Sequence, residues 1–200
     1  MSSEFGHYPV DRNINTWISS IYCEKWGLKE GLRELMQNQR DELINLLGKD
    51  NIEAKVFGAR HEFKFLKKGT EEEYGSIKYD RVMQILSLEN KGKLETFNLL
   101  LGGTTRNPQN NSAITGQFGE GLKIAAIALL RQNKKLSIIN TDQVWRFSLQ
   151  PDNKFIRNGQ PERCLFWRWD PYDNPENRGK VVVQIENILS LNSGFKIISP

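Results

Sequence analysis

Three polar residues, Glu34, Asn38 and Asp41, recur at i, i+4 and i+7 in the segment Gly31–Leu47. Because an α-helix turns by about 100° per residue, this spacing places all three side chains on one face of a helix. A carboxylate, an amide and a second carboxylate in one row can activate a water molecule, bind a hard cation or hold ordered water. A solvated helix face would show the same row, so the segment alone leaves both interpretations open.

The same segment carries the apolar residues that a helix needs to pack against a core. Leucines and a methionine form a second stripe, which we expect to be buried: Leu32, Leu35, Met36, Leu43, Leu46 and Leu47. We therefore predict a helix over Gly31–Leu47 that buries one face and presents the polar row on another.

A glycine-rich segment lies much later in the chain, at Gly116–Lys123, and runs directly into the helix-forming segment Ile124–Arg131. Its three glycines, Gly116, Gly119 and Gly121, would let the backbone approach an anion closely. The helix N-terminus would add unpaired N–H groups, and phosphate is the usual anion in such a place. The spacing matches neither the P-loop nor the dinucleotide fingerprint, and a flexible turn is the other interpretation.

In this order, the two motifs resemble the ATP-binding domain shared by type II topoisomerase gyrase, the ninety-kilodalton heat-shock chaperones, the histidine kinases and the MutL mismatch-repair proteins. The helix segment matches the superfamily pattern Glu-x-x-x-Asn-x-x-Asp, and the later segment matches its Gly-x-x-Gly-x-Gly. The residue patterns of the two motifs are most similar to those of the chaperone and Morc-type members. The resemblance extends from about Trp26 to Val183, which is most of the chain.

The resemblance implies a role for each matching residue. Glu34 would be the catalytic base, Asn38 would be the Mg²⁺ ligand, and Asp41 would hold water or the network near the adenine. ATP and Mg²⁺ are the implied cofactors. The later motif would close over the triphosphate, with the last residue either neutralising the γ-phosphate or facing solvent: Gly116, Gln117, Phe118, Gly119, Glu120, Gly121, Leu122 and Lys123.

The adenine-binding motif of the superfamily, Asp-x-Gly-x-Gly, matches this chain only in part. The corresponding residues 88–94 read Leu-Glu-Asn-Lys-Gly-Lys-Leu. Aligning Glu89 with the aspartate keeps a carboxylate and the apolar Leu94 but loses both glycines. Aligning Asn90 keeps Gly92 and loses the charge. We favour Glu89 as the contact of the adenine amine and keep Asn90 as the alternative.

Downstream, Leu101–Arg106 resembles the turn that begins the ATP lid of the superfamily, and it supplies Thr104 and Thr105 as candidate nucleotide contacts. The lid itself would be Asn107–Thr115, which is rich in polar turn-forming residues. We therefore expect this region to be mobile and to close over bound nucleotide.

The remaining segments predict a single α+β domain at residues 26–200, preceded by an N-terminal arm or short helix at 1–25. Ile52–Phe65 and Tyr79–Leu88 read as strands, and four late apolar runs are spaced as antiparallel strands: Leu136–Ile139, Val144–Leu149, Leu165–Trp169 and Val181–Ile185. The expected fold, which the resemblance also implies, is a Bergerat-type two-layer sandwich. It would have a mixed, mostly antiparallel sheet with helices on one face.

Composition sets the expectations about compartment and partners. The sequence contains no apolar run of membrane-spanning length and no signal peptide, so we expect no membrane partner. Cys23 and Cys164 are too few for a disulfide framework and indicate a reducing, intracellular compartment, cytoplasmic or nuclear. The net charge of +4 is modest and spread along the chain, which allows an acidic partner without requiring one.

The sequence supports two functions. The first is a slow, Mg²⁺-dependent ATPase that binds ATP or ADP, closes its lid and forms a homodimer on ATP binding. The second is a weakly active or inactive scaffold for a protein or nucleic-acid partner, which the altered adenine motif favours. Glu34 favours the enzyme, because a mere nucleotide binder needs no general base. The chain ends where members of the superfamily continue into a second domain, so we expect a fragment or a minimal protein with slow turnover.

Overall fold

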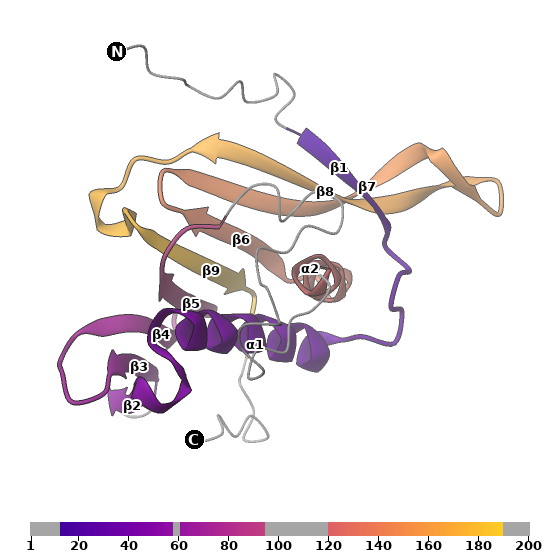
Figure 1. Ribbon diagram of the computed structural model, residues 1–200. Helices are drawn as coiled ribbons and strands as arrows, with labels where there is room; N and C mark the ends of the chain where they lie inside the picture. The colour runs from indigo at the N-terminus through magenta and orange to yellow at the C-terminus, as the bar shows by residue number, and fades with distance from the viewer. Residues whose placement is uncertain (1–12, 58–60, 95–119, 190–200) are drawn as a thin grey trace, which may run out of the picture.

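A computed structural model describes residues 13–57, 61–94 and 120–189 of the chain. In this part of the chain, nine strands form one sheet and two α-helices pack against it (Figure 1). The strands are β1 (Asn13–Ser19), β2 (Ile52–Phe57), β3 (Glu62–Lys67), β4 (Glu73–Asp80), β5 (Ile85–Lys91), β6 (Lys135–Asn140), β7 (Gln143–Arg157), β8 (Gln160–Pro171) and β9 (Lys180–Glu186). The helices are α1 (Leu28–Leu47) and α2 (Gly121–Arg131).

The sheet is antiparallel throughout. Its strand order is β1-β8-β7-β6-β9-β5-β4-β3-β2, and each neighbouring pair runs in opposite directions. Two meanders, β2 to β5 and β6 to β8, make up most of the sheet. They are joined through β9, which lies between β5 and β6.

The predicted fold class, a Bergerat-type α+β sandwich with a mixed sheet, is therefore wrong. The described residues contain no parallel strand pair and only two α-helices beside nine strands, so the fold is dominated by its sheet. The main reason lies in the hairpin of β7 and β8, which extends well beyond the apolar runs that predicted it. Its outer half is rich in polar and charged residues, and the strand signal from buried alternation ends near Leu149.

The four late apolar runs are confirmed as strands, β6 to β9. Three other predictions differ from the structure. The N-terminal region forms an edge strand, β1, that pairs with β8, and so it is neither a separate arm nor a helix over the described part. Tyr79–Leu88, predicted as one strand, contains the end of β4, a turn and the beginning of β5. Ile52–Phe65 likewise contains two paired strands, all of β2 and the beginning of β3.

Helix α1 begins at Leu28, three residues earlier than predicted, because the chain caps its first turn. The Glu30 carboxylate accepts a hydrogen bond from the backbone N–H of Gly27 at 2.9 Å. The helix ends at Leu47, as predicted, and Gly48 follows with φ of +80°. Its apolar stripe is buried at Leu32, Leu35 and Leu43, whereas Leu46 is 40% exposed and does not belong to the core.

The two helices cross in close contact at Gly31 of α1. A Cβ atom on this residue would lie 3.3 Å from the backbone oxygen of Ala125 and 3.2 Å from Cγ of Leu129, both on α2. The missing side chain therefore lets the two helix backbones approach closely. This crossing brings the following turn of α1, with Glu34, to the N-terminus of α2.

Candidate functional site

Glu34 lies against the first residue of α2. A Cβ atom on Gly121 would be only 1.9 Å from Oε1 of Glu34 and 2.7 Å from its carboxyl carbon. Glycine alone leaves room for a carboxylate there, and the backbone N–H groups and dipole of a helix N-terminus favour negative charge. The structure thus brings together the predicted catalytic base and the end of the predicted glycine loop.

The glycine-rich segment does not end where the sequence suggested. Helix α2 begins at Gly121, so Leu122 and Lys123 belong to its first turn and not to a loop. Glu120 is the residue before the helix, and its carboxylate accepts a hydrogen bond from the Tyr22 hydroxyl at 3.3 Å. Several predicted nucleotide contacts lie outside the described residues, together with the lid at 107–115: Thr104, Thr105, Gly116, Gln117, Phe118 and Gly119.

Lys123 is buried, with only 3% of its surface exposed. The alternative that this side chain faces solvent is therefore excluded. Burial lowers the pKa of the Lys123 ammonium group below its usual value, and the nearby Glu120 carboxylate partly opposes this shift. A buried ammonium group beside a helix N-terminus makes this part of the molecule electropositive, which favours an anionic ligand.

The polar row of α1 is not a solvated face. Asn38 is half-buried and Asp41 is fully buried, with an exposed fraction of 0%. The Arg40 guanidinium lies 3.3 Å from Oδ1 of Asp41. Because a helix rises 1.5 Å per residue, the row from Glu34 to Asp41 is about 10 Å long. It thus extends from the start of α2 toward the part of α1 that covers β5.

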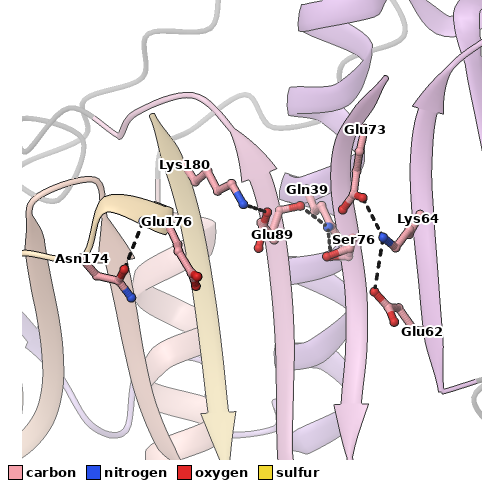
Figure 2. A network of polar contacts seen from close by, with 9 residues as sticks. All are labelled: Gln39, Glu62, Lys64, Glu73, Ser76, Glu89, Asn174, Glu176 and Lys180. Atoms are coloured by element: carbon pink, nitrogen blue, oxygen red, sulfur yellow. Dashed lines mark hydrogen bonds and ion pairs between the residues drawn. The ribbon is translucent and has the colours of Figure 1, made fainter. Parts of the chain in front are cut away.

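Gln39 connects α1 to the sheet. Its side-chain Nε2 donates hydrogen bonds to the backbone oxygens of Ser76 on β4, at 2.8 Å, and of Glu89 on β5, at 3.0 Å (Figure 2). Gln39 is not one of the residues that the sequence motifs predicted for the site. The available signal was its position in the apolar stripe of the helix, where a polar side chain needs a buried partner.

Asn90 faces α1 from β5. Its side-chain Nδ2 donates a hydrogen bond to the backbone oxygen of Gln39 at 3.2 Å, and only 8% of the residue is exposed. Its Oδ1 atom has no hydrogen-bond partner among the described residues. A Cβ atom on Gly75, opposite Asn90 on β4, would lie 2.6 Å from this oxygen. Asn90 therefore holds a buried hydrogen-bond acceptor under α1, beside Gln39.

Glu89 points to the other face of the sheet. Side chains alternate along a strand, and the buried residues Leu86, Leu88 and Asn90 occupy the face of β5 that α1 covers. On the opposite face, Oε1 of Glu89 lies 2.8 Å from Nζ of Lys180 on β9 (Figure 2). The structure thus places Asn90 under α1, at the backbone of Gln39, and it does not place the Glu89 carboxylate there.

Gly92 follows β5 in a conformation that favours glycine, with φ of +126°. Its N–H donates a hydrogen bond to the backbone oxygen of Gly179 at 2.8 Å. A Cβ atom on Gly92 would lie 3.7 Å from Oε1 of Glu42 on α1. This predicted site residue therefore lies beside the C-terminal half of α1, next to the strand that carries Asn90.

The donor atoms of the polar row suit a magnesium site that has few protein ligands. Within residues 13–57, 61–94 and 120–189, no three His, Cys, Asp or Glu side chains are grouped to hold a metal ion. Mg²⁺ often needs no such cage, because it keeps several waters and takes most other ligands from substrate phosphates. Asn38 offers one amide oxygen on the same helix face as Glu34, which suits this mode of binding.

No protein-family model matches this chain, and no curated protein matches it. Neither α1 nor α2, the two α-helices in the part of the chain that the structure describes, is long and apolar enough to cross a membrane.

Proposed function

We propose that this protein binds ATP and hydrolyses it slowly in the presence of Mg²⁺. The observation that carries the proposal is the contact of Glu34 with Gly121 at the N-terminus of α2. Hydrolysis of a phosphoanhydride requires a group that activates water beside groups that neutralise the phosphoryl charge. Glu34 is the first kind of group. The first turn of α2, which includes the buried Lys123, offers the second kind.

The nucleotide would lie along the polar face of α1. Its γ-phosphate would be at Glu34 and its base would be near Asn90, which bonds to the backbone of Gln39. The Asn90 Oδ1 atom would accept a hydrogen bond from the exocyclic amine of the base, which would satisfy a buried acceptor. This arrangement replaces Glu89, our first choice from the sequence, by the neighbouring Asn90.

Residues of α1 and of the first turn of α2 have separate tasks in this proposal. Glu34 would orient the attacking water and take its proton. Asn38 would hold Mg²⁺, which when bound supplies positive charge to the phosphate oxygens. Lys123 and the first N–H groups of α2 would stabilise the negative charge that grows on the phosphoryl group. Residues 101–119, which lie outside the described part of the chain, would close over the nucleotide, and dimerisation on ATP binding would accompany this closure.

A second candidate function is a scaffold that binds a protein or nucleic-acid partner without turning over nucleotide. The position of Glu89 favours this alternative, because the only carboxylate of the altered adenine motif pairs with Lys180 on the opposite face. The bonds of Gln39 and Asn90 would then serve only to join α1 to the sheet.

Substitution of Glu34 distinguishes the two functions. Glu34→Gln keeps the size of the side chain but removes the general base, so it should lower the single-turnover rate of ATP hydrolysis by about 10²- to 10⁴-fold. ATP affinity, measured by calorimetry with and without Mg²⁺, should stay near that of the wild type, because the base acts on water and contributes little to ground-state binding.

Glu30→Gln is the matched control, since this residue lies one turn earlier on α1 and glutamine can also cap the helix. It should leave both rate and affinity unchanged. Equal rates for wild type and Glu34→Gln would contradict the role of Glu34. Absence of ATP binding to the wild-type protein at millimolar concentration would leave the scaffold as the better function.

A further inference from the structure

Strand β2 forms one edge of the sheet, and its outer side has no strand partner among the described residues. The direction of its backbone groups follows from the neighbouring strand. The N–H of Lys68 donates to the backbone oxygen of Asn51 at 2.8 Å, and the next residue, Ile52, lies opposite Lys67. Asn51 and Lys68 therefore form a hydrogen-bonded pair, and such pairs alternate with non-bonded ones along an antiparallel ladder.

This alternation fixes which residues of β2 are free to bond a new strand. Glu53, Lys55 and Phe57 direct their backbone groups toward β3. The N–H and C=O groups that point out of the sheet edge belong to the other three residues of the strand: Ile52, Ala54 and Val56.

The side chains of these three residues are apolar and lie on the helix-covered face. Val56 is opposite Phe63 on β3, which is opposite the buried Ile77 of the core. Even so, Ala54 is exposed and Val56 has an exposed fraction of 56%. An edge strand with exposed apolar side chains and free backbone groups is a template for pairing with another strand.

We propose that two copies of this chain pair through β2, antiparallel, about a two-fold axis at Ala54. In this register Ala54 lies opposite itself, and Ile52 lies opposite Val56 of the second copy. All three outward-pointing residues then form hydrogen-bonded pairs. Two antiparallel sheets thereby become one continuous sheet, and the contact is the same on both copies, as a two-fold interface requires.

The charges of β2 match the same register. Glu53 lies opposite Lys55 of the second copy, twice in each dimer, and these are the non-bonded pairs in which facing side chains approach most closely. Moving the two-fold axis to Val56 would place Lys55 opposite Phe57, and moving it to Ile52 would place Glu53 opposite Asn51. Of these registers, only the one centred on Ala54 pairs apolar residues with each other on one face and Glu53 with Lys55 on the other.

Lys55 explains why the partner is a second copy and not an arbitrary strand. A lysine in the middle of an edge strand discourages pairing, because its charge needs a partner. Within the chain, Nζ of Lys55 lies 2.8 Å from the exposed Glu71 carboxylate, a contact at the surface that water can replace. The second copy supplies Glu53 directly opposite, so the edge accepts its own sequence and disfavours strands without an acidic residue at that place.

Charge reversal tests the register. Sedimentation velocity in the absence of nucleotide is the measurement, because pairing through β2 does not depend on the dimerisation on ATP binding proposed above. The wild type should dimerise with rising concentration. Glu53→Lys places lysine opposite lysine, and Lys55→Glu places glutamate opposite glutamate. The dimer affinity of each variant alone should therefore be lower than that of the wild type by a factor of about ten or more. An equimolar mixture of the two variants restores both opposite-charge pairs, so it should form a heterodimer with an affinity close to that of the wild type.

Two further variants complete the test. Ala54→Pro removes an outward N–H without removing a bond to β3, so it should weaken the dimer while thermal unfolding shows an intact fold. Glu176→Lys makes the same charge change away from β2 and should dimerise as the wild type does. A wild-type protein that stays monomeric at the highest attainable concentration overturns the proposal. So does a mixture of the two charge variants that associates no better than either variant alone.

Discussion

Asn90 and Glu89 are neighbours on β5, yet their side chains lie in opposite environments. Asn90 is buried against α1 and bonds to the backbone of Gln39. Glu89 instead pairs with Lys180 on the face away from α1 (Figure 2). The face of the sheet away from α1, here called the open face, carries partly exposed polar groups that water can satisfy. Polar groups under a helix need a hydrogen-bond partner from the protein or from a ligand. The Oδ1 atom of Asn90, which has no hydrogen-bond partner in the described part of the chain, is therefore the more informative of the two polar groups.

The open face carries ion pairs of an ordinary surface kind. Nζ of Lys64 lies 2.9 Å from Glu73, and Nζ of Lys91 lies 2.8 Å from Glu72, both between partly exposed side chains (Figure 2 shows the first pair). Such pairs contribute little free energy because solvent screens them. The candidate site belongs to the helix-covered face, and variants of the two faces should differ accordingly.

The largest expected effect comes from Gly75→Ala. A Cβ atom at this position would lie 2.5 Å from the backbone oxygen of Glu89 and 2.6 Å from Oδ1 of Asn90. The first atom is backbone and the second is held by the bond of Asn90 to α1, so neither can move away easily. We expect the free energy of unfolding to fall by about 3 kcal/mol, the upper end of the range for overpacking.

Denaturation with urea measures this loss, and Gly69→Ala is the control. Gly69 has φ of +75° and no atom near its Cβ position, so its substitution should cost only about 1 kcal/mol of backbone strain. Equal losses for the two variants would show that the space between β4 and β5 at Asn90 is not closely packed.

The sequence predicted the elements with strong periodicity. The polar row of α1 and the four late strands follow from spacings that a helix or a strand imposes locally. The contact of Glu34 with Gly121 does not follow from any local pattern, because it depends on the close crossing at Gly31. The sheet-dominated fold was missed because β1 and the outer parts of β7 and β8 contain many polar residues.

The choice between Glu89 and Asn90 was available in the sequence. Leu86 and Leu88 alternate with polar residues, and the same period of two continues to Asn90 and excludes Glu89 from the buried face. The likeness of this segment to the adenine-binding motif favoured the carboxylate of Glu89 instead. The physical period of the strand was the better guide to which side chain lies under the helix.

The second expected effect is that of Asn90→Ala. This change removes the hydrogen bond to Gln39 and the buried acceptor, so we expect a loss of about 1 kcal/mol in the free energy of unfolding. If the base of ATP binds Asn90 as proposed, the affinity for ATP should fall about tenfold or more, as calorimetry would show. Unchanged affinity for ATP would place the base elsewhere.

The smallest expected effect is that of Glu89→Gln, which removes one charge from the open face. The side chains of Glu89 and Lys180 are 25% and 38% exposed, so their pair should contribute at most about 1 kcal/mol to stability, and less at high salt. The backbone oxygen of Glu89 still accepts the bond from Gln39, so the attachment of α1 is preserved. ATP affinity should therefore equal that of the wild type. Unfolding in urea should show a small loss in the free energy of unfolding at low salt and a smaller loss at high salt. Glu89→Gln could instead weaken ATP binding as much as Asn90→Ala does. Nucleotide binding would then depend on both faces of β5, and the assignment of the site to the helix-covered face would fail.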